Sequence, residues 1–237
     1  MTTLPAHTGA DVHLADAFGR PGCPLCHERA RAEAAYLESI LAESVNDVPF
    51  RQGLDAGRGF CAAHCRTVLA ADRRRAGSLG GAILLRATLV ARLRDLEAVH
   101  EAGWRTRARR AAEAALPPAC PACRRISESE AALVEGLVRL AEDAAWAEAV
   151  SAAALCVDHL VALMDRRRVP PWWPAIEARQ LERLRELTDR LERFAHASAH
   201  DRLHLQTDDQ RASVDEAADL LGGGQHGTGL SRRTPRG

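Results

Sequence analysis

The chain lacks several features that would point to a common class of protein. None of its 237 residues is lysine, so 32 arginines alone balance 32 acidic residues, to a formal net charge of +0. A neutral chain exerts no general attraction on nucleic acid or anionic membranes. We ascribe the missing lysine to codon bias in a GC-rich genome and give it no functional weight. Aromatic residues make up only 4%, which predicts a core of leucine and alanine between closely packed helices.

Two further absences concern location and catalysis. The N-terminal stretch has no positively charged segment followed by an apolar run, and no later run approaches a membrane span. We therefore expect a cytoplasmic protein, in which paired thiols stay reduced. The chain also has no glycine-rich phosphate loop, serine nucleophile elbow or His-Glu-x-x-His motif. No catalytic residue is predicted, and we expect a protein that is not an enzyme.

What the sequence does contain is one cysteine and histidine pattern, present twice. A Cys-Pro-x-Cys pair precedes a Cys-x-x-His pair by 34 residues in the first copy and by 32 in the second. Three thiolates and one imidazole meet the four-ligand requirement of structural Zn²⁺, and ligands at i and i+3 share one helix face. We predict two Zn²⁺ per chain, one closing each copy. The predicted ligand sets are Cys23, Cys26, Cys61 and His64, and Cys120, Cys123, Cys156 and His159.

The likeness of the two copies extends beyond the ligands. Glu33-Ala34-Ala35 and Glu38 align without gaps with Glu130-Ala131-Ala132 and Glu135. We interpret this as an internal duplication in which each unit is closed by its own metal.

Helical periodicity is nearly continuous and predicts an all-α fold without strands. Asn46-Asp47 and Pro49 break the first helix and can cap the next one. Trp172-Trp173 can form an exposed binding patch or a plug that seats the last helices on the core. The predicted parts are a first metal-binding helical unit at 11–79, a long linking helix at 80–117, a second metal-binding helical unit at 118–168, C-terminal helices at 169–222 and a disordered tail at 223–237.

Residues around the first ligand set carry a family resemblance. They are Ala17-Phe18, Cys23-Pro24-Leu25-Cys26, Tyr36-Leu37, Glu43-Ser44-Val45-Asn46-Asp47, Gly59-Phe60-Cys61-Ala62-Ala63-His64 and Ala82-Ile83-Leu84. With them the chain resembles, over about 11–222, the bacterial family catalogued as domain of unknown function 6062. The resemblance implies a cytoplasmic, metal-binding helical protein and brings no established activity.

The second copy departs from this pattern. Asp143-Ala144 replaces the Asn-Asp pair and Ala154-Leu155 replaces the Gly-Phe pair. We therefore expect any further contact site in the first copy, at Glu43–Asp47, where capping is the competing role.

Other identities for the metal sites remain open. The cysteines could be buried free thiols, and iron–sulfur clusters also bind thiolates, although [4Fe–4S] clusters normally take four of them. Cys23-Pro-Leu-Cys26-His27 spells a haem attachment signature, but the second copy has Arg124 where His27 would be. The seventh cysteine, Cys65, could be a reactive thiol or a small buried hydrophobe.

Several charged groups also have two interpretations. His196, His200 and His204 could line one helix face and bind a transition metal, or be solvated near a fraying helix end. The arginine clusters at 73–75, 105–110 and 166–168 could contact phosphates, or be solvated helix faces and helix ends.

Three functions follow from these patterns. The first is a non-catalytic scaffold stapled by two structural zinc ions, which binds an unknown protein or small ligand. The second is a thiol or zinc redox sensor, supported by Cys65. The third is a nucleic-acid-associated factor. We expect no membrane partner, favour a protein or small ligand over nucleic acid as the partner, and leave the oligomeric state open.

Overall fold

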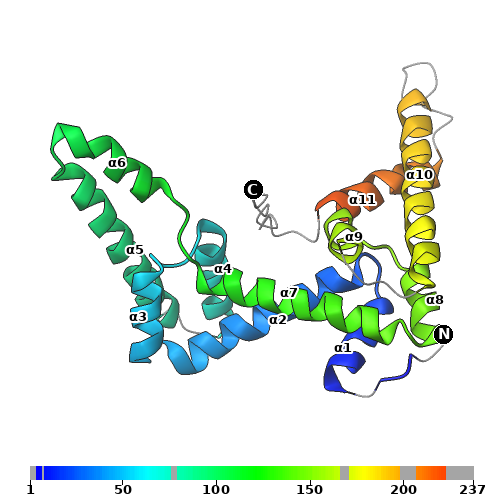
Figure 1. The fold of residues 1–237 in the computed structure, drawn as a ribbon, viewed down its shortest axis with the longest axis horizontal. Helices are drawn as coiled ribbons and strands as arrows, with labels where there is room; N and C mark the ends of the chain where they lie inside the picture. Colours follow the sequence, from blue (N-terminus) through cyan, green and yellow to red (C-terminus); the bar gives the residue numbers. More distant parts are fainter. Residues whose placement is uncertain (1–3, 7, 76–78, 166–170, 198–206, 223–237) are drawn as a thin grey trace. The chain divides into compact units, whose positions relative to one another are not determined.

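The computed structural model describes residues 4–6, 8–75, 79–165, 171–197 and 207–222, and this part of the chain is helical without strands (Figure 1). The all-α prediction is therefore confirmed. The predicted tail, His200, His204 and the arginines at 166–168 lie outside the described residues. The elements are α1 (Gly9–Phe18), α2 (Pro24–Ser39), the π-helical turn η1 (Ile40–Ser44), α3 (Val48–Ala56), α4 (Ala62–Arg74), α5 (Leu79–His100), α6 (Trp104–Ala115), α7 (Pro121–Leu140), α8 (Ala144–Ala152), α9 (Val157–Met164), α10 (Trp173–Ala197) and α11 (Asp208–Gly222).

These helices form two compact units that do not coincide with the two copies of the repeat. The terminal unit contains the described residues up to 30 and from 130 onward, and the central unit contains residues 31–129. The boundaries fall inside α2 and α7. Helix α2 therefore begins in the terminal unit and ends in the central unit, and α7 does the reverse.

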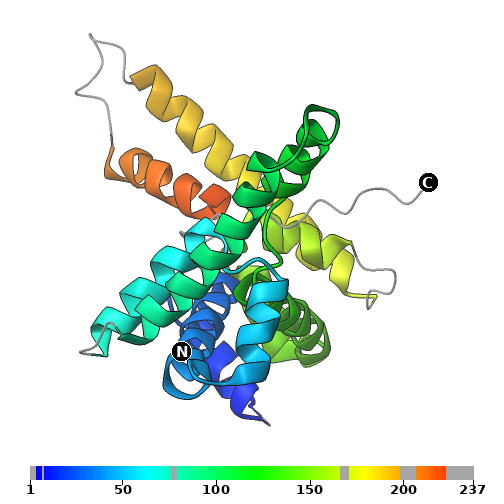
Figure 2. The same ribbon diagram turned by 90° about the vertical axis from the view of Figure 1, so that its left-hand side faces the viewer.

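The central unit packs around α5. The buried side of this helix, with Leu84 and Ala91, faces α3 and α4, and α6 folds back along its second half (Figures 1 and 2). The long linking helix predicted from sequence is thus two helices, and that prediction is wrong. Gly103 occupies the N-cap position of α6 after the break, a position at which glycine is well tolerated. The core comprises Leu37, Ile40, Leu41, Leu54, Phe60, Val68, Ala71, Leu84, Cys120, Ala122 and Ile126.

The terminal unit has its own core, built around two tryptophans. Trp146 is buried, donates from Nε1 to the carbonyl of Pro5 at 2.8 Å, and meets the Phe18 ring edge-on. Trp173 is only 1% exposed and Trp172 is half-buried, which favours the plug over the exposed patch. The remaining core residues include Leu14, Leu25, Leu137, Val150, Leu155, Leu160, Leu163 and Ile176.

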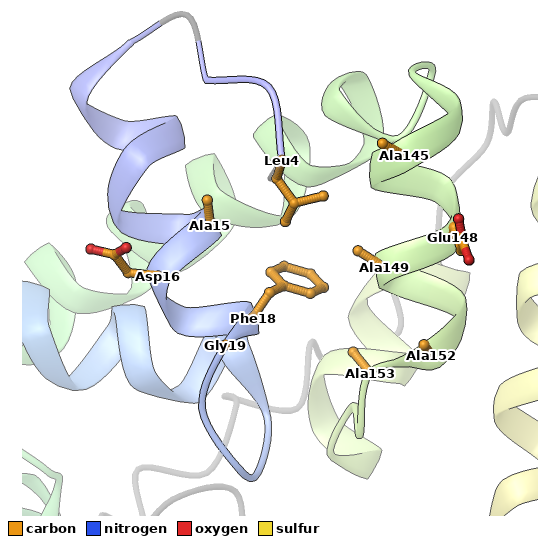
Figure 3. A pocket seen from close by; sticks show the side chains of 10 residues that line it. All are labelled: Leu4, Ala15, Asp16, Phe18, Gly19, Ala145, Glu148, Ala149, Ala152 and Ala153. Carbon is orange, nitrogen blue, oxygen red and sulfur yellow. The ribbon is translucent and has the colours of Figure 1, made fainter. Parts of the chain in front are cut away.

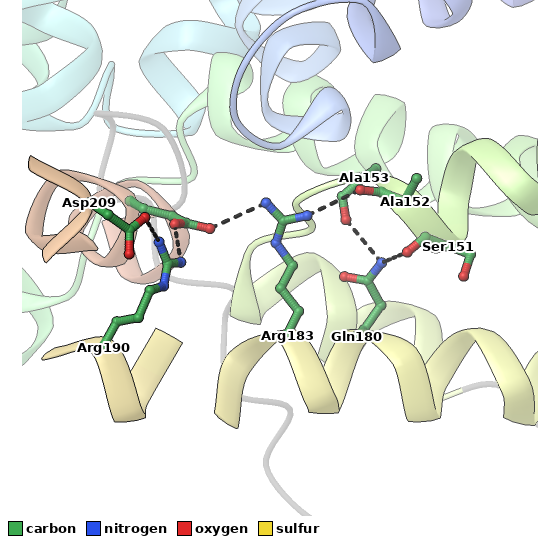
Figure 4. A network of polar contacts seen from close by, with 8 residues as sticks. Ser151, Ala152, Ala153, Gln180, Arg183, Arg190 and Asp209 are labelled. Carbon is green, nitrogen blue, oxygen red and sulfur yellow. Dashed lines mark hydrogen bonds and ion pairs between the residues drawn. The ribbon is translucent and has the colours of Figure 1, made fainter. Parts of the chain in front are cut away.

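Helix α10 satisfies the C-terminal carbonyls of α8 and joins them to α11 (Figure 4). Buried Gln180 donates from Nε2 to three of these carbonyls at 2.9, 3.2 and 3.0 Å. Arg183 donates to a fourth at 3.1 Å and to Glu216 of α11 at 3.2 Å. Burial opposes the ionisation of Glu216, but hydrogen bonds from Arg190 and Arg183 lower its pKa. The network therefore fixes the end of α8, which leads to the second Cys-x-x-His pair.

Both copies have the same order of helices, α2–α3–α4 and α7–α8–α9, and the same cap. Asp47 accepts from Phe50 N at 2.6 Å at the start of α3, and Asp143 accepts from Ala145 N at 2.9 Å at the start of α8. Our inference that the second copy had lost this break is therefore wrong. Asp47 follows Cys26 by 21 residues and Asp143 follows Cys123 by 20. The extra residue is accommodated in η1, because a π-helical turn holds more residues than an α-helical one.

Candidate metal centres

All four cysteine motifs lie at the start of a helix. Cys23 and Cys120 directly precede α2 and α7, whereas Cys61 and Cys156 are the N-caps of α4 and α9. In each motif the carbonyl of the first cysteine accepts a hydrogen bond from the backbone N–H four residues later, at 2.9 to 3.2 Å. The thiols thus lie at positive helix ends, which favour thiolates. A proline opens α2 and α7, where a missing N–H costs nothing.

These helices bring all eight predicted ligands together in two groups of four, but the groups differ from those predicted. The Cys156 site, in the terminal unit, consists of Cys23, Cys26, Cys156 and His159. The Cys61 site, in the central unit, consists of Cys61, His64, Cys120 and Cys123. The prediction that each copy closes its own site is therefore wrong, because the Cys-Pro-x-Cys pair of one copy meets the Cys-x-x-His pair of the other.

The physical reason for this exchange lies in α2 and in the turn before Cys61. Helix α2 has 16 residues and so carries the chain about 24 Å away from its own cysteines. At Gly57 the returning chain instead meets the segment before Cys120, since Ala119 N donates to the Gly57 carbonyl at 2.8 Å. Gly59 completes the turn at φ 87, where an added Cβ would lie 2.4 Å from Thr88.

The ligand atoms of each site lie at the corners of a small tetrahedron. His159 Nδ1 lies 3.0 to 3.5 Å from the three sulfurs of its site, and His64 Nδ1 lies 3.1 to 3.6 Å from its own three. Two of the sulfur–sulfur distances are 3.5 and 3.7 Å. A tetrahedral ion with bonds of zinc–ligand length needs about 3.8 Å between sulfurs and about 3.6 Å from sulfur to nitrogen. Disulfides need about 2.05 Å, and all seven cysteines are free. Each site can therefore hold one metal ion.

A glutamate lies against the outer nitrogen of each ligand histidine. A carboxylate oxygen of Glu130 lies 2.9 Å from His159 Nε2, and one of Glu33 lies 3.4 Å from His64 Nε2. This contact leaves Nδ1 facing the sulfurs, as outer-shell carboxylates do in metal sites. The repeat alignment contained both glutamates, but we assigned them no role. The signal that could have identified them is that a glutamate follows each Cys-Pro-x-Cys pair at the same distance.

The two long helices therefore serve both sites. Helix α2 supplies thiols to the Cys156 site and Glu33 to the Cys61 site, and α7 supplies thiols to the Cys61 site and Glu130 to the Cys156 site. In each helix the carboxylate follows the second cysteine by seven residues.

The crowded sulfurs share their protons unequally. A hydrogen bond from Cys123 holds the pKa of Cys120 at about 3, and the same contact raises the pKa of Cys123. In the other site, hydrogen bonds, first that with Cys156, lower the pKa of Cys23 and raise that of Cys26. At least one thiolate is therefore favoured in each site at neutral pH.

The ligand histidines respond to this negative charge. Burial opposes protonation of His64, but hydrogen bonds with Cys120 and Glu33 raise its pKa to about 10. Burial likewise opposes protonation of His159, and hydrogen bonds with Cys156 and Cys23 raise its pKa to about 11. Both sites therefore favour positive charge at their centres, which either a proton or a metal cation can supply.

The neighbouring candidate residues lie outside both clusters. Half-buried Cys65 has its Sγ 3.8 Å from the Phe60 carbonyl, and burial, followed by nearby Cys61 and Cys120, raises its pKa. A raised pKa leaves less reactive thiolate, which favours the buried-hydrophobe interpretation. His27 Nε2 lies 2.7 Å from the Pro21 carbonyl, while the cysteines of its signature belong to the Cys156 site.

The charged groups noted in the sequence are exposed on helices. The arginines at 73–75 are exposed at the end of α4. Arg109 and Arg110 both pair with Glu113, at 2.8 and 3.1 Å. His196 is exposed and lies 3.8 Å from Glu192. Within the described residues, His196 is not part of a metal-binding group.

A groove of about 500 Å³ lies between α1 and α8 in the terminal unit (Figure 3). Leu4 and Phe18 project into it opposite alanines of α8, and Asp16 and Glu148 are its ionisable lining residues among those described. Its surface is therefore mainly apolar, with two exposed carboxylates at its rim. The remaining lining residues are Ala15, Gly19, Ala145, Ala149, Ala152 and Ala153.

The fold and the two sites define an all-α protein with a duplicated helical unit and two Cys₃His clusters that can each hold a metal ion. A model described as "Family of unknown function (DUF6062)" matches residues 10–202, so the chain belongs to this family. No curated protein and no solved structure matches the chain. Among the described helices, none is long and apolar enough to cross a membrane.

Proposed function

We propose that the protein is a non-catalytic helical scaffold of the cytoplasm that is stapled by two structural Zn²⁺ and binds another protein or a small ligand through its helical faces. The supporting observation is that each site offers four protein ligands, with a carboxylate on the outer nitrogen of its histidine. A catalytic zinc keeps one position open for water. Four protein ligands fill the tetrahedron and leave no such position.

The donor set favours zinc over other metals. Thiolates and imidazole together suit Zn²⁺, whereas carboxylate and carbonyl oxygens suit Mg²⁺ and Ca²⁺. Cubane iron–sulfur clusters normally take four thiolates, and each site here has three. The protein would contribute the eight ligands and the two outer carboxylates, and the ion would contribute cross-linking.

Because the ligand sets are exchanged between the copies, each metal ion closes a longer loop and can stabilise the folded chain more. The Cys156 site joins Cys26 to Cys156 across 130 residues, and the Cys61 site joins Cys61 to Cys123 across 62. Closing a longer loop removes more conformational entropy from the unfolded chain. Because the unfolded chain has no preformed site, the free energy of metal binding contributes directly to folding.

Metal analysis combined with thermal unfolding tests this proposal. We expect two zinc ions per chain after gentle purification, and a much lower melting temperature after chelation at neutral pH. Iron in place of zinc, or less than one zinc per chain, would contradict the metal assignment. An unchanged unfolding curve after complete zinc removal would contradict the structural role.

A redox sensor is a second candidate, favoured by one observation. Cys61 and Cys123, both ligands of the Cys61 site, are half-buried rather than fully enclosed. Oxidation of such ligands would eject zinc and release the ends of α4 and α7. Treatment with mild peroxide tests this alternative: zinc retained at both sites argues against a sensor, and reversible release from the Cys61 site supports one.

A further inference from the structure

Helix α5 has a second apolar face that the described residues leave uncovered. Its buried face includes Leu84 and Ala91. On another side, Leu89, Leu93 and Leu96 are 69%, 49% and 62% exposed. A row of large apolar side chains exposed on one side of a helix commonly marks an interaction site. The exposed leucines therefore form a candidate interaction surface in the central unit.

The spacing of these leucines matches a helix-pairing seam. They are four and then three residues apart, the a/d spacing by which two helices interlock. At 3.6 residues per turn, exposed Arg86 and Glu97 both lie on one flank of this row. Neither makes an ion pair within the described part of the chain. We call Leu89, Leu93, Leu96, Arg86 and Glu97 the leucine stripe.

The order of charges identifies a partner that the stripe fits. Arg86 and Glu97 carry opposite charges and are 11 residues apart, about 16 Å along the helix. An antiparallel copy of the same helix sets Leu89 against Leu93 and brings Arg86 beside Glu97 at both ends. A two-fold axis requires this self-complementarity. We propose that the leucine stripe pairs with that of a second copy of this chain in an antiparallel homodimer.

The opposite flank of α5 argues against a parallel pair. Parallel pairing would set the Arg86 and Glu97 flank against the flank that carries Arg92. Arg92 already contacts Asp95 at 3.3 Å and donates to the Ala114 carbonyl at 2.9 Å. These contacts hold α6 against α5, so this guanidinium is already engaged within the chain.

The size of the stripe sets the expected strength of the dimer. Stable interfaces bury about 800 Å² on each partner, and three exposed leucines with their rims offer less than that. We therefore expect association in the micromolar range, stronger at low salt because the ion pairs at the rim are exposed. The pairing needs no particular role for the metal sites, and so it stands apart from the proposed scaffold function.

Sedimentation of the full chain with its zinc tests the proposal. The average mass should rise from 25.7 kDa toward twice that value between roughly 1 μM and roughly 100 μM. Leu93→Glu should keep the chain monomeric throughout this range. Leu221→Glu is the matched control, because Leu221 is 73% exposed on α11, and it should dimerise like the wild type. Circular dichroism is the control that checks whether both variants keep their helices.

A charge exchange tests the antiparallel arrangement itself. Arg86→Glu and Glu97→Arg should each weaken dimerisation roughly tenfold, because each change places like charges together at both ends. The double variant should recover wild-type association. A wild type that stays monomeric, a Leu93→Glu variant that still dimerises, or a double variant weaker than both single variants would overturn the proposal. A monomer would indicate instead that another part of the chain, or a different protein, covers the stripe.

Discussion

The Cys156 site and the Cys61 site have the same ligand types but differ in their access to solvent. In the Cys156 site, Cys23, Cys156 and His159 are buried and Cys26 is half-buried. In the Cys61 site, two of the four ligands, Cys61 and Cys123, are half-buried. The outer carboxylate is also closer in the Cys156 site, at 2.9 Å against 3.4 Å.

The difference in solvent access gives the two sites different roles, although their motifs are the same in the sequence. Cys23 and Cys156 belong to the apolar core of the terminal unit, next to Leu25 and Leu160. An ion there would be enclosed with the core. In the Cys61 site Cys120 also belongs to a core, that of the central unit, but Cys61 and Cys123 are half-buried at the N-terminal ends of α4 and α7. Water, chelators and oxidants can approach these two sulfurs more easily. One duplicated motif can thus supply one permanent staple and one more labile staple.

The largest expected effect tests which motifs share an ion. Cys26→Ser with Cys156→Ser should remove one zinc and leave one, because both residues belong to the Cys156 site. Cys26→Ser with Cys61→Ser should remove both. Zinc per chain after gel filtration is the measurement. Loss of a structural site can cost on the order of 10 kcal/mol. The variant without zinc should therefore melt at a lower temperature than the variant that keeps one zinc ion.

The opposite result has an equally definite meaning. If each copy closed its own site, the first pair of changes would leave no zinc and the second would leave one. Cys65→Ser is the matched control, since Cys65 is a half-buried thiol outside both clusters, and it should retain both ions.

The sequence correctly predicted the eight residues that gather and the types of motif that combine, but not their partners. Cysteine spacing is a local property, and the two Cys-Pro-x-Cys pairs can be matched to the two Cys-x-x-His pairs in two ways. The choice depends on the length of α2 and on the bond from Ala119 to Gly57. Both are tertiary features that spacing does not encode. The positions of Glu33 and Glu130 were visible in the repeat, and only the fold places them beside the histidines.

The outer carboxylates should have the next largest effect. Glu130→Gln removes the charge that faces His159 Nε2 while keeping the side-chain shape, and Glu33→Gln does the same for His64. Losing such a partner costs 10- to 100-fold in metal affinity. Competition with a chromophoric zinc chelator should show one weakened site in each variant. Glu38→Gln, at an exposed position five residues further along α2, should leave both affinities unchanged.

Solvent access should produce a smaller, kinetic difference. With excess chelator at neutral pH, zinc should leave in two phases, and the faster should come from the Cys61 site. We expect a several-fold difference in rate, since metal release requires its ligands to become accessible. Cys123→Ser should abolish the fast phase and Cys156→Ser the slow one. A single phase, or the reverse assignment, would show that the half-buried sulfurs do not control release.

The helices were easier to predict than their ends. Apolar periodicity correctly predicted that the described chain is helical almost throughout, because it reports the buried face of a helix directly. It missed the break at 101–103 between α5 and α6, since the residues there have no strong stop signal before Gly103. It also led us to treat the two interhelical breaks as different. The single residue gained in η1 shifts the alignment and conceals that Asp47 and Asp143 are equivalent.

The smallest effect concerns these two caps, where the copies should behave alike. Asp47→Ala removes the acceptor for Phe50 N, and Asp143→Ala removes the acceptor for Ala145 N and Trp146 N. Loss of an N-cap aspartate costs about 1 kcal/mol, so each variant should lower the free energy of unfolding by that amount and keep both zinc ions. Denaturant unfolding measures the cost, and Asp47→Asn and Asp143→Asn, which retain a capping oxygen, should recover most of it.

If Asp47→Ala leaves stability unchanged but abolishes recovery of a binding partner that Asp143→Ala still recovers, then the two breaks are not equivalent. The first copy would then carry a contact site at Glu43–Asp47 in addition to its cap.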